Sequence, residues 1–163
     1  GVQTCALPIF ELLEGNRLEQ FNTKAKIALT YINQEQYGKS IGLLEEIDQQ
    51  NLTAQTVESF PIDVKHNLGM AHLRLNQFEK ARKKLVEATE LYEVSNNRLA
   101  LRNGYGLLGE TYLKMGDYVK AIEAYDKCIQ ILEWSKEFVA GDEDFLNEIL
   151  RERQAAEDGL ALD

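Results

Sequence analysis

An internal repeat is the feature that most constrains what this chain can fold into. Three segments, residues 27–47, 68–88 and 108–128, align without gaps, and equivalent positions lie 41 and then 40 residues apart. A period of this length is typical of proteins built from stacked supersecondary units, each of which buries its apolar face against the next. The sequence therefore predicts a row of similar units.

The pattern inside each unit predicts two antiparallel helices packed face to face, with no sheet. Small and large residues stand three apart, which places them on one face of a helix. Small residues opposite large ones let two helices approach closely and interdigitate. The small positions hold Ala28, Gly69 and Gly109 in the first helices and Ser40, Ala81 and Ala121 in the second; the large ones hold Tyr31, His72 and Tyr112, then Tyr37, Phe78 and Tyr118, then Leu44, Leu85 and Tyr125.

A short turn is expected between the two helices of each unit. Asn76 and Gly116 stand just past the end of the first helix in the second and third units, where a left-handed residue is common. Glu35 takes this place in the first unit and suits it less well, so we expect that turn to differ. Between units, a turn is predicted at residues 96–97, and the polar residues 51–59 predict a loop.

This pattern resembles the tetratricopeptide repeat family over about residues 21–133. The third unit matches best, through Leu108, Gly109, Tyr112, Gly116, Tyr118, Ala121 and Tyr125. The usual repeat has about 34 residues, whereas here the extra length lies between units of constant internal spacing, as in a longer variety of the repeat. The resemblance implies an all-α, right-handed α-solenoid of three helical hairpins plus a C-terminal capping helix.

The expected division is one domain, residues 10–163, with repeats at about 21–54, 62–95 and 102–135 and a last helix at about 142–158. Asp142 can cap this helix. Its apolar stripe holds Phe145, Leu146, Ile149 and Leu150. A terminal helix with a polar outer face commonly covers the end of a repeat stack, so we interpret it as a cap. The alternative is the first helix of a fourth repeat.

The first nine residues are expected to be foreign to the protein. Read back into codons, residues 1–9 resemble a common short-read sequencing adapter, so we exclude them from the fold. The alternative is an ordinary disordered terminus. Without these residues Cys128 is the only cysteine, which leaves no intrachain disulfide and favours a reducing compartment such as the cytoplasm.

Catalytic, metal and nucleic-acid functions have little support in the sequence. His66 and His72 are six residues apart, whereas a metal-binding pair on a helix needs three or four. Cys128 falls at a packing position, so a buried thiol is expected there and not a nucleophile. The net charge of −9 disfavours nucleic acid and anionic membranes. We therefore expect no enzyme activity, no cofactor and no metal.

The resemblance also implies a binding surface, because in this family the first helix of each unit lines a concave groove. Carried over by position, the groove would hold Asn22, Asp63, His66, Asn67, Met70, Asn103, Leu107 and Glu110, with Ala25, Leu29 and Gly106 beside them. One subtype grips the C-terminal carboxylate of chaperones with Lys, Arg and Asn at five such positions. Only Asn67 fits that set here, so we exclude binding of that type.

The sequence thus predicts a non-catalytic module that binds a protein or peptide in this groove. Asp63 and Glu110, together with the negative net charge, favour a neutral to basic partner segment, with Met70 and Leu107 as its apolar contacts. The nearby cations Arg74 and Lys114 fall toward the ends of their helices and are expected to leave the groove acidic. The alternative is a sensory or regulatory region of a larger bacterial signalling protein, such as a kinase or transcription regulator.

Overall fold

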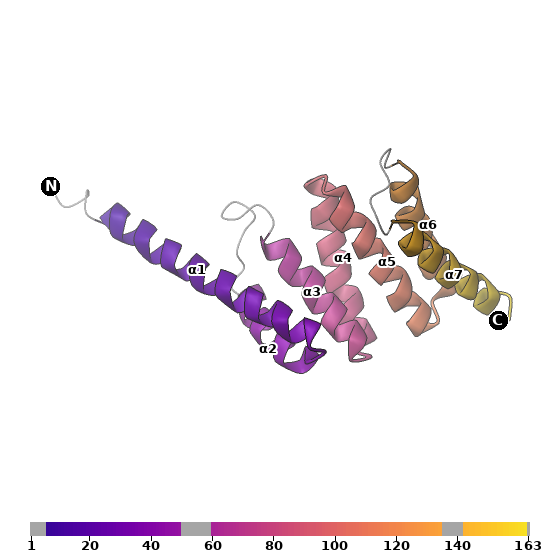
Figure 1. Ribbon diagram of the computed structural model, residues 1–163, viewed down its shortest axis with the longest axis horizontal. Helices are drawn as coiled ribbons and strands as arrows, with labels where there is room; N and C mark the ends of the chain where they lie inside the picture. The colour runs from indigo at the N-terminus through magenta and orange to yellow at the C-terminus, as the bar shows by residue number, and fades with distance from the viewer. Residues whose placement is uncertain (1–5, 50–59, 135–141, 163) are drawn as a thin grey trace.

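The computed structural model describes residues 6–49, 60–134 and 142–162, and this described part consists of helices without a strand. The helices are α1 (Ala6–Asn33), α2 (Tyr37–Asp48), α3 (Phe60–Arg74), α4 (Phe78–Val94), α5 (Arg98–Met115), α6 (Tyr118–Trp134) and α7 (Asp142–Leu160). Figure 1 shows them in a row in chain order, with α1 at one end and α7 at the other. The predicted all-α stack of helical hairpins is confirmed.

The helices form two layers that differ in spacing. Each odd-numbered helix packs against the even-numbered helix that follows it, and successive hairpins pack on one another through α2 and α3 and through α4 and α5. Within the described residues, odd-numbered neighbours also touch one another, whereas the even-numbered helices do not. The stack is therefore concave on the side of α1, α3, α5 and α7.

The small and large residues of the repeat meet as the sequence predicts. A Cβ atom added to Gly69 would lie 2.5 Å from Cγ of Leu85, and one added to Gly109 would overlap the ring of Tyr125. Leu85 and Tyr125 are completely buried. The other small positions, Ala28, Ser40, Ala81 and Ala121, are completely buried as well. Close approach at these points fixes the two helices of each hairpin together.

The expectation that the first turn differs is wrong. Glu35 has φ 58°, the same left-handed conformation as Asn76 at 58° and Gly116 at 76°. In each turn the next residue donates its N–H to a carbonyl five residues earlier; for Gln36 the distance to the oxygen of Tyr31 is 2.8 Å. This bond satisfies a carbonyl at the helix end. It helps to offset the roughly 1–2 kcal/mol that the left-handed region costs a residue with a side chain.

The helix boundaries agree with the turn predicted between the second and third units. They do not test the predicted loop at residues 51–59 or the predicted domain boundaries. The turn at residues 96–97 is confirmed, because α4 ends at Val94 and α5 begins at Arg98. The expected loop at residues 51–59 lies outside the described residues. Helix α1 begins at Ala6, well before the expected start of the first repeat, and the domain boundaries and the origin of residues 1–9 stay predictions.

The α1 end of the stack presents an apolar side chain that later units bury. Ile27 corresponds to Leu68 and Leu108 in the repeat. Leu68 and Leu108 are 0% and 4% exposed, because the second helix of the preceding unit covers them, whereas Ile27 is 44% exposed. The first helix of the stack thus shows the face on which a second helix packs elsewhere.

The α7 end is built differently. Helix α7 packs on α6 and touches α5, which is the place that the first helix of a next unit would take. Ile149 is buried as Leu108 is, but Leu150 is 44% exposed and does not belong to the buried stripe expected from the sequence. Leu150 follows Ile149 where the units have Ala28, Gly69 and Gly109. A leucine there leaves no room for a closely packed second helix, so α7 is suited to end the stack.

A buried ion pair joins α7 to the stack. Asp142 is the first residue of α7, and its Oδ1 lies 2.6 Å from Nη1 of Arg102 on α5. The two side chains are 4% and 15% exposed. The guanidinium of Arg102 also lies 5.4 Å from the ring centre of Phe145. Asp142 therefore ties α7 to the preceding hairpin, and its expected role as the cap of α7 stays a prediction.

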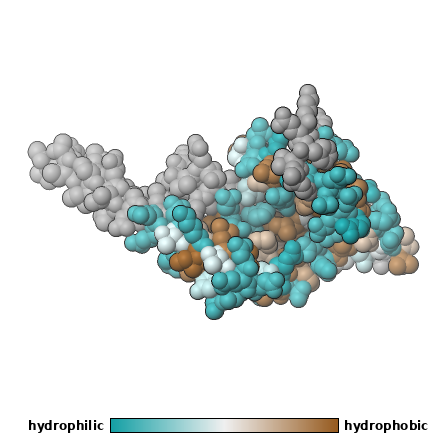
Figure 2. All heavy atoms as spheres, in the orientation of Figure 1, coloured by the Kyte–Doolittle hydropathy of each residue, from teal (hydrophilic) through white to brown (hydrophobic). Residues whose placement is uncertain are grey.

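The face of the molecule seen in Figure 2 is mainly hydrophilic where it is coloured. Figure 2 shows polar residues over most of the visible face, with hydrophobic residues in small groups between them. None of the helices in the described part of the chain is long and apolar enough to cross a membrane.

Candidate functional site

A hollow of about 310 Å³ opens on the concave side, between α3, α5 and α7. We call it the α3–α5–α7 hollow. Five of the eight residues that the sequence places in the groove line it, which are His66, Met70, Asn103, Leu107 and Glu110. The other lining residues are Arg74, Gly106, Phe145, Glu148, Ile149 and Glu152. These five residues share one concavity, and α7 supplies one of its walls.

Three of the expected groove residues lie outside this hollow. Asn22 is exposed on α1. Asp63 accepts a hydrogen bond from the hydroxyl of Tyr92, with 3.2 Å between the oxygens. Asn67 is half-buried on α3. The carboxylate of Asp63 is therefore engaged by α4 and is not part of the hollow.

Arg74 takes part in the hollow, contrary to the expectation from its place near the end of α3. Its Nη1 lies 2.6 Å from Oε1 of Glu110 on α5. The Arg74 side chain is 39% exposed and that of Glu110 is 20% exposed. The sequence analysis expects the negative charge of Glu110 to attract the partner. In the structure Arg74 balances this charge within the protein.

The uncompensated negative charge of the hollow comes from α7 instead. Glu148 and Glu152 both line it, one helical turn apart. The hydroxyl of Tyr125 donates a hydrogen bond to Oε2 of Glu152 at 2.8 Å. Burial, and then the negative charges of Glu110 and Glu148, hold the pKa of Glu152 above its usual value. Position in the repeat could not identify these residues, because α7 lies outside the matched units.

His66 forms part of the α3 wall as a neutral ring. Its ring lies edge-on to that of Tyr92, with 5.9 Å between the centroids. Burial lowers the pKa of His66 below its usual value, although Asp63 acts in the opposite direction. His66 therefore contributes polarity and shape to the hollow at neutral pH, and no positive charge.

The other chemically active side chains serve packing. His72 is 3% exposed, and its Nδ1 lies 2.8 Å from Oε1 of Gln77. Cys128 is completely buried, and this burial raises the pKa of its thiol to about 12. The expected buried thiol is thus confirmed. No group of three or more His, Cys, Asp or Glu residues able to hold a metal ion occurs within the residues described.

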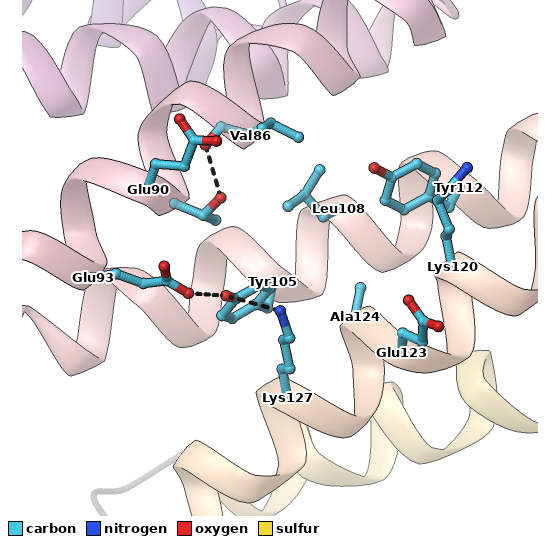
Figure 3. A pocket seen from close by; sticks show the side chains of 11 residues that line it. Val86, Glu90, Glu93, Tyr105, Leu108, Tyr112, Lys120, Glu123, Ala124 and Lys127 are labelled. Atoms are coloured by element: carbon cyan, nitrogen blue, oxygen red, sulfur yellow. Dashed lines mark hydrogen bonds between the residues drawn. The ribbon is translucent and has the colours of Figure 1, made fainter.

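A second hollow, of about 300 Å³, lies between α4 and α6 and over α5. Figure 3 shows its side chains, with Tyr105 and Lys127 close together. The Tyr105 hydroxyl donates to Glu93, and Nζ of Lys127 lies 4.9 Å from the Tyr105 ring centre. Lys120 pairs with Asp117 at 2.5 Å. The cations of this hollow are thus occupied by groups of the protein itself.

Comparisons with known proteins find a repeat family, a relative and a solved structure that this chain is similar to. Residues 62–133 match the family model described as tetratricopeptide repeat. A BBSome complex member, BBS4 of Bos taurus, is 40% identical over 68 residues, which are 42% of this chain and 12% of that protein. The chain therefore spans only a small part of this relative. The Sgt2 TPR domain from Aspergillus fumigatus has a TM-score of 0.54 at 22% identity, over 86% of this chain and 83% of that domain, which shows a shared fold.

The family match and the hairpin packing agree on the same residues. The matched stretch contains α4, α5 and nearly all of α3 and α6, which include the glycine contacts of the second and third units. Residues 62–133 thus match the tetratricopeptide repeat model, and the chain shares the fold of a solved TPR domain.

Proposed function

We propose that this chain is a module that binds a segment of another protein in the α3–α5–α7 hollow. The observation that carries the proposal is the make-up of the hollow. Met70, Leu107 and Ile149 give it apolar surface, and charged side chains surround them. Protein interfaces gain affinity from apolar anchors that fill a pocket, and gain specificity from the charges around it. The match of residues 62–133 to the tetratricopeptide repeat model supports the same use, because stacked repeats form extended concave surfaces.

The partner segment is neutral to basic and has apolar anchors. The chain has a formal net charge of −9, and its long-range field favours approach by basic segments and slows approach by acidic ones. Within the hollow, one arginine stands against three glutamates. This charge supports a protein segment as the occupant and disfavours nucleic acid.

The test is capture of partners by the immobilised chain, followed by titration calorimetry with the partner recovered. Met70→Ala and Leu107→Ala are expected to weaken binding by tenfold or more, because each removes an apolar contact from the hollow. Val119→Ala on α6 is the matched control, since Val119 is 52% exposed and lies outside the hollow. Full affinity in both hollow variants, with unchanged melting temperatures, would place the binding site elsewhere.

A further inference from the structure

At the α7 wall of the α3–α5–α7 hollow, negative charges outnumber positive ones. The single cation of the hollow, Arg74, is paired with Glu110 at 2.6 Å. Glu148 makes no hydrogen bond or ion pair to any other described residue and is exposed. Among the described residues, Glu152 accepts a hydrogen bond only from the neutral hydroxyl of Tyr125. Two carboxylates therefore face the hollow, and no cation in the described part of the chain forms an ion pair with either of them.

We propose that the α7 wall receives one cationic side chain of the bound segment, best an arginine, between Glu148 and Glu152. This inference rests on the proposed function and adds the chemistry of one position in the partner. The aliphatic stem of the arginine would pack against Phe145 and Ile149, which line the same wall. Basic side chains commonly bury their stems on apolar surface and keep the charged head near polar groups.

The spacing of the two carboxylates suits this occupant. Residues four apart on a helix point to the same side, so Glu148 and Glu152 present adjacent acceptors. The guanidinium group offers five N–H donors in a planar fork, which can bind two carboxylates at once. Tyr125 occupies Oε2 of Glu152 and holds that side chain in place. The second oxygen of Glu152 remains as an acceptor for the partner.

Glu152 is repelled by the negative charges of Glu110 and Glu148, and the arginine of the partner would relieve this repulsion. The charged groups that act on Glu152 are Glu110 and Lys114 from α5 and Glu148 from its own helix, and Tyr125 faces it from α6. Burial and the two glutamates hold the pKa of Glu152 above its usual value. A bound cation reverses this effect and favours the ionised form. Affinity for a cationic segment should therefore fall as the pH falls through that raised pKa.

The experiment selects short peptides from a random library on the immobilised full chain. For the tightest binder, each arginine is replaced in turn by citrulline, its neutral isostere, and affinity is measured by fluorescence anisotropy. At one arginine position, replacement by citrulline is expected to weaken binding of the peptide to the wild-type chain by tenfold or more. The same replacement should have little effect on the Glu148→Gln/Glu152→Gln variant. Glu143→Gln on α7 is the control, because Glu143 is exposed and outside the hollow.

The outcomes separate this inference from the function on which it rests. Peptides that need Met70 and Leu107 but tolerate citrulline at every position would overturn the arginine site and leave the groove function intact. Binders that ignore all of the hollow variants, or a selection that recovers no binder, would overturn both. Thermal melts establish that the glutamine variants are folded, and neutral glutamine at position 152 can still accept the Tyr125 hydroxyl.

Discussion

Gly109 on α5 faces the ring of Tyr125 on α6 so closely that a methyl group at Gly109 would overlap the ring atoms. The ring has nowhere to move, because Tyr125 is completely buried and its hydroxyl is bound to Glu152 at 2.8 Å. The absence of a side chain at position 109 therefore sets the distance between the two helices of the third hairpin.

Replacement of this glycine should destabilise the protein. Gly109→Ala is expected to lower the free energy of unfolding by roughly 1–3 kcal/mol through overpacking, and Gly109→Leu by more. Gly42→Ala on α2 is the control, since a Cβ there meets no atom within 4 Å. This control should raise stability by roughly 0.5–1 kcal/mol, because alanine suits a helix interior better than glycine. Urea denaturation measures the free energy of unfolding of both variants. A change of the same sign in Gly109→Ala and Gly42→Ala would contradict the hairpin register.

Ser40→Ala should leave the protein as stable or make it more stable. The hydroxyl of Ser40 is buried without a hydrogen-bond partner among the described residues, and its position is alanine in the next two units, Ala81 and Ala121. A buried unsatisfied polar group costs about 1–3 kcal/mol, so its removal is expected to raise the melting temperature. Differential scanning calorimetry measures the change. A clear loss of stability would mean that the hydroxyl has a partner in solution.

Four charged residues that join α2, α3 and α4 should make stability fall in acid. Nζ of Lys65 lies 2.9 Å from Asp48 and 2.7 Å from Glu87, and Nζ of Lys84 lies 2.5 Å from Asp48. Burial acts to raise the pKa of Asp48, but the hydrogen bonds from Lys84 and Lys65 outweigh it and lower that pKa below 3.8. The pKa of Glu87 is lowered below 4.5 by the same balance.

A group whose pKa is lower in the folded state contributes stability above its unfolded pKa, and this contribution is lost as the pH falls through the folded value. Asp48→Asn is therefore expected to be less stable than the wild type at neutral pH, by roughly 1–3 kcal/mol. The difference should narrow below about pH 4, where the unfolded carboxylate takes up its proton. Urea denaturation across this range tests it, with exposed Glu90→Gln on α4 as the control. A difference that stays constant with pH would exclude the ionised Asp48 as its source.

The Arg102–Asp142 pair should decide whether α7 stays docked. Asp142→Asn leaves the guanidinium of Arg102 largely buried without its counter-charge, and loss of one partner of a buried pair costs roughly 3–5 kcal/mol. Because α7 is the last helix described, the effect should appear as faster amide hydrogen exchange in α7 and not as unfolding of the whole stack. Exposed Asp144→Asn is the control. Equal exchange rates in the two variants would show that the pair does not hold α7.

The fold could be predicted because its determinants are local and repeated. Gly69 and Gly109 recur at one position of the pattern, and each meets the large residue, Leu85 or Tyr125, that the pattern sets against it. The turn at Glu35 could not be predicted in the same way. Residue preference favours glycine or asparagine there, whereas the hydrogen bond from Gln36 to Tyr31 is made by the backbone and leaves no mark in the sequence.

The residues that line the α3–α5–α7 hollow were predictable only where they lie on repeated helices. Leu107 and Glu110 were found by position because α5 belongs to a matched unit. Glu148 and Glu152 belong to α7, whose contribution to the hollow depends on how it packs against α5 and α6. The exposure of Leu150 beside buried Ile149 has the same origin, since an apolar stripe does not specify which edge of it meets the neighbouring helix.

Because of Ile27 and Leu150, the two ends of the stack differ in their ability to accept a further helical hairpin. A helical hairpin grafted ahead of α1 would find an apolar side chain already in the position that a second helix covers in the later units. One grafted after α7 would meet a leucine where close approach requires alanine or glycine, and its designer would first have to change that residue. Longer synthetic arrays can therefore be assembled from the α1 side, with α7 kept as their terminus.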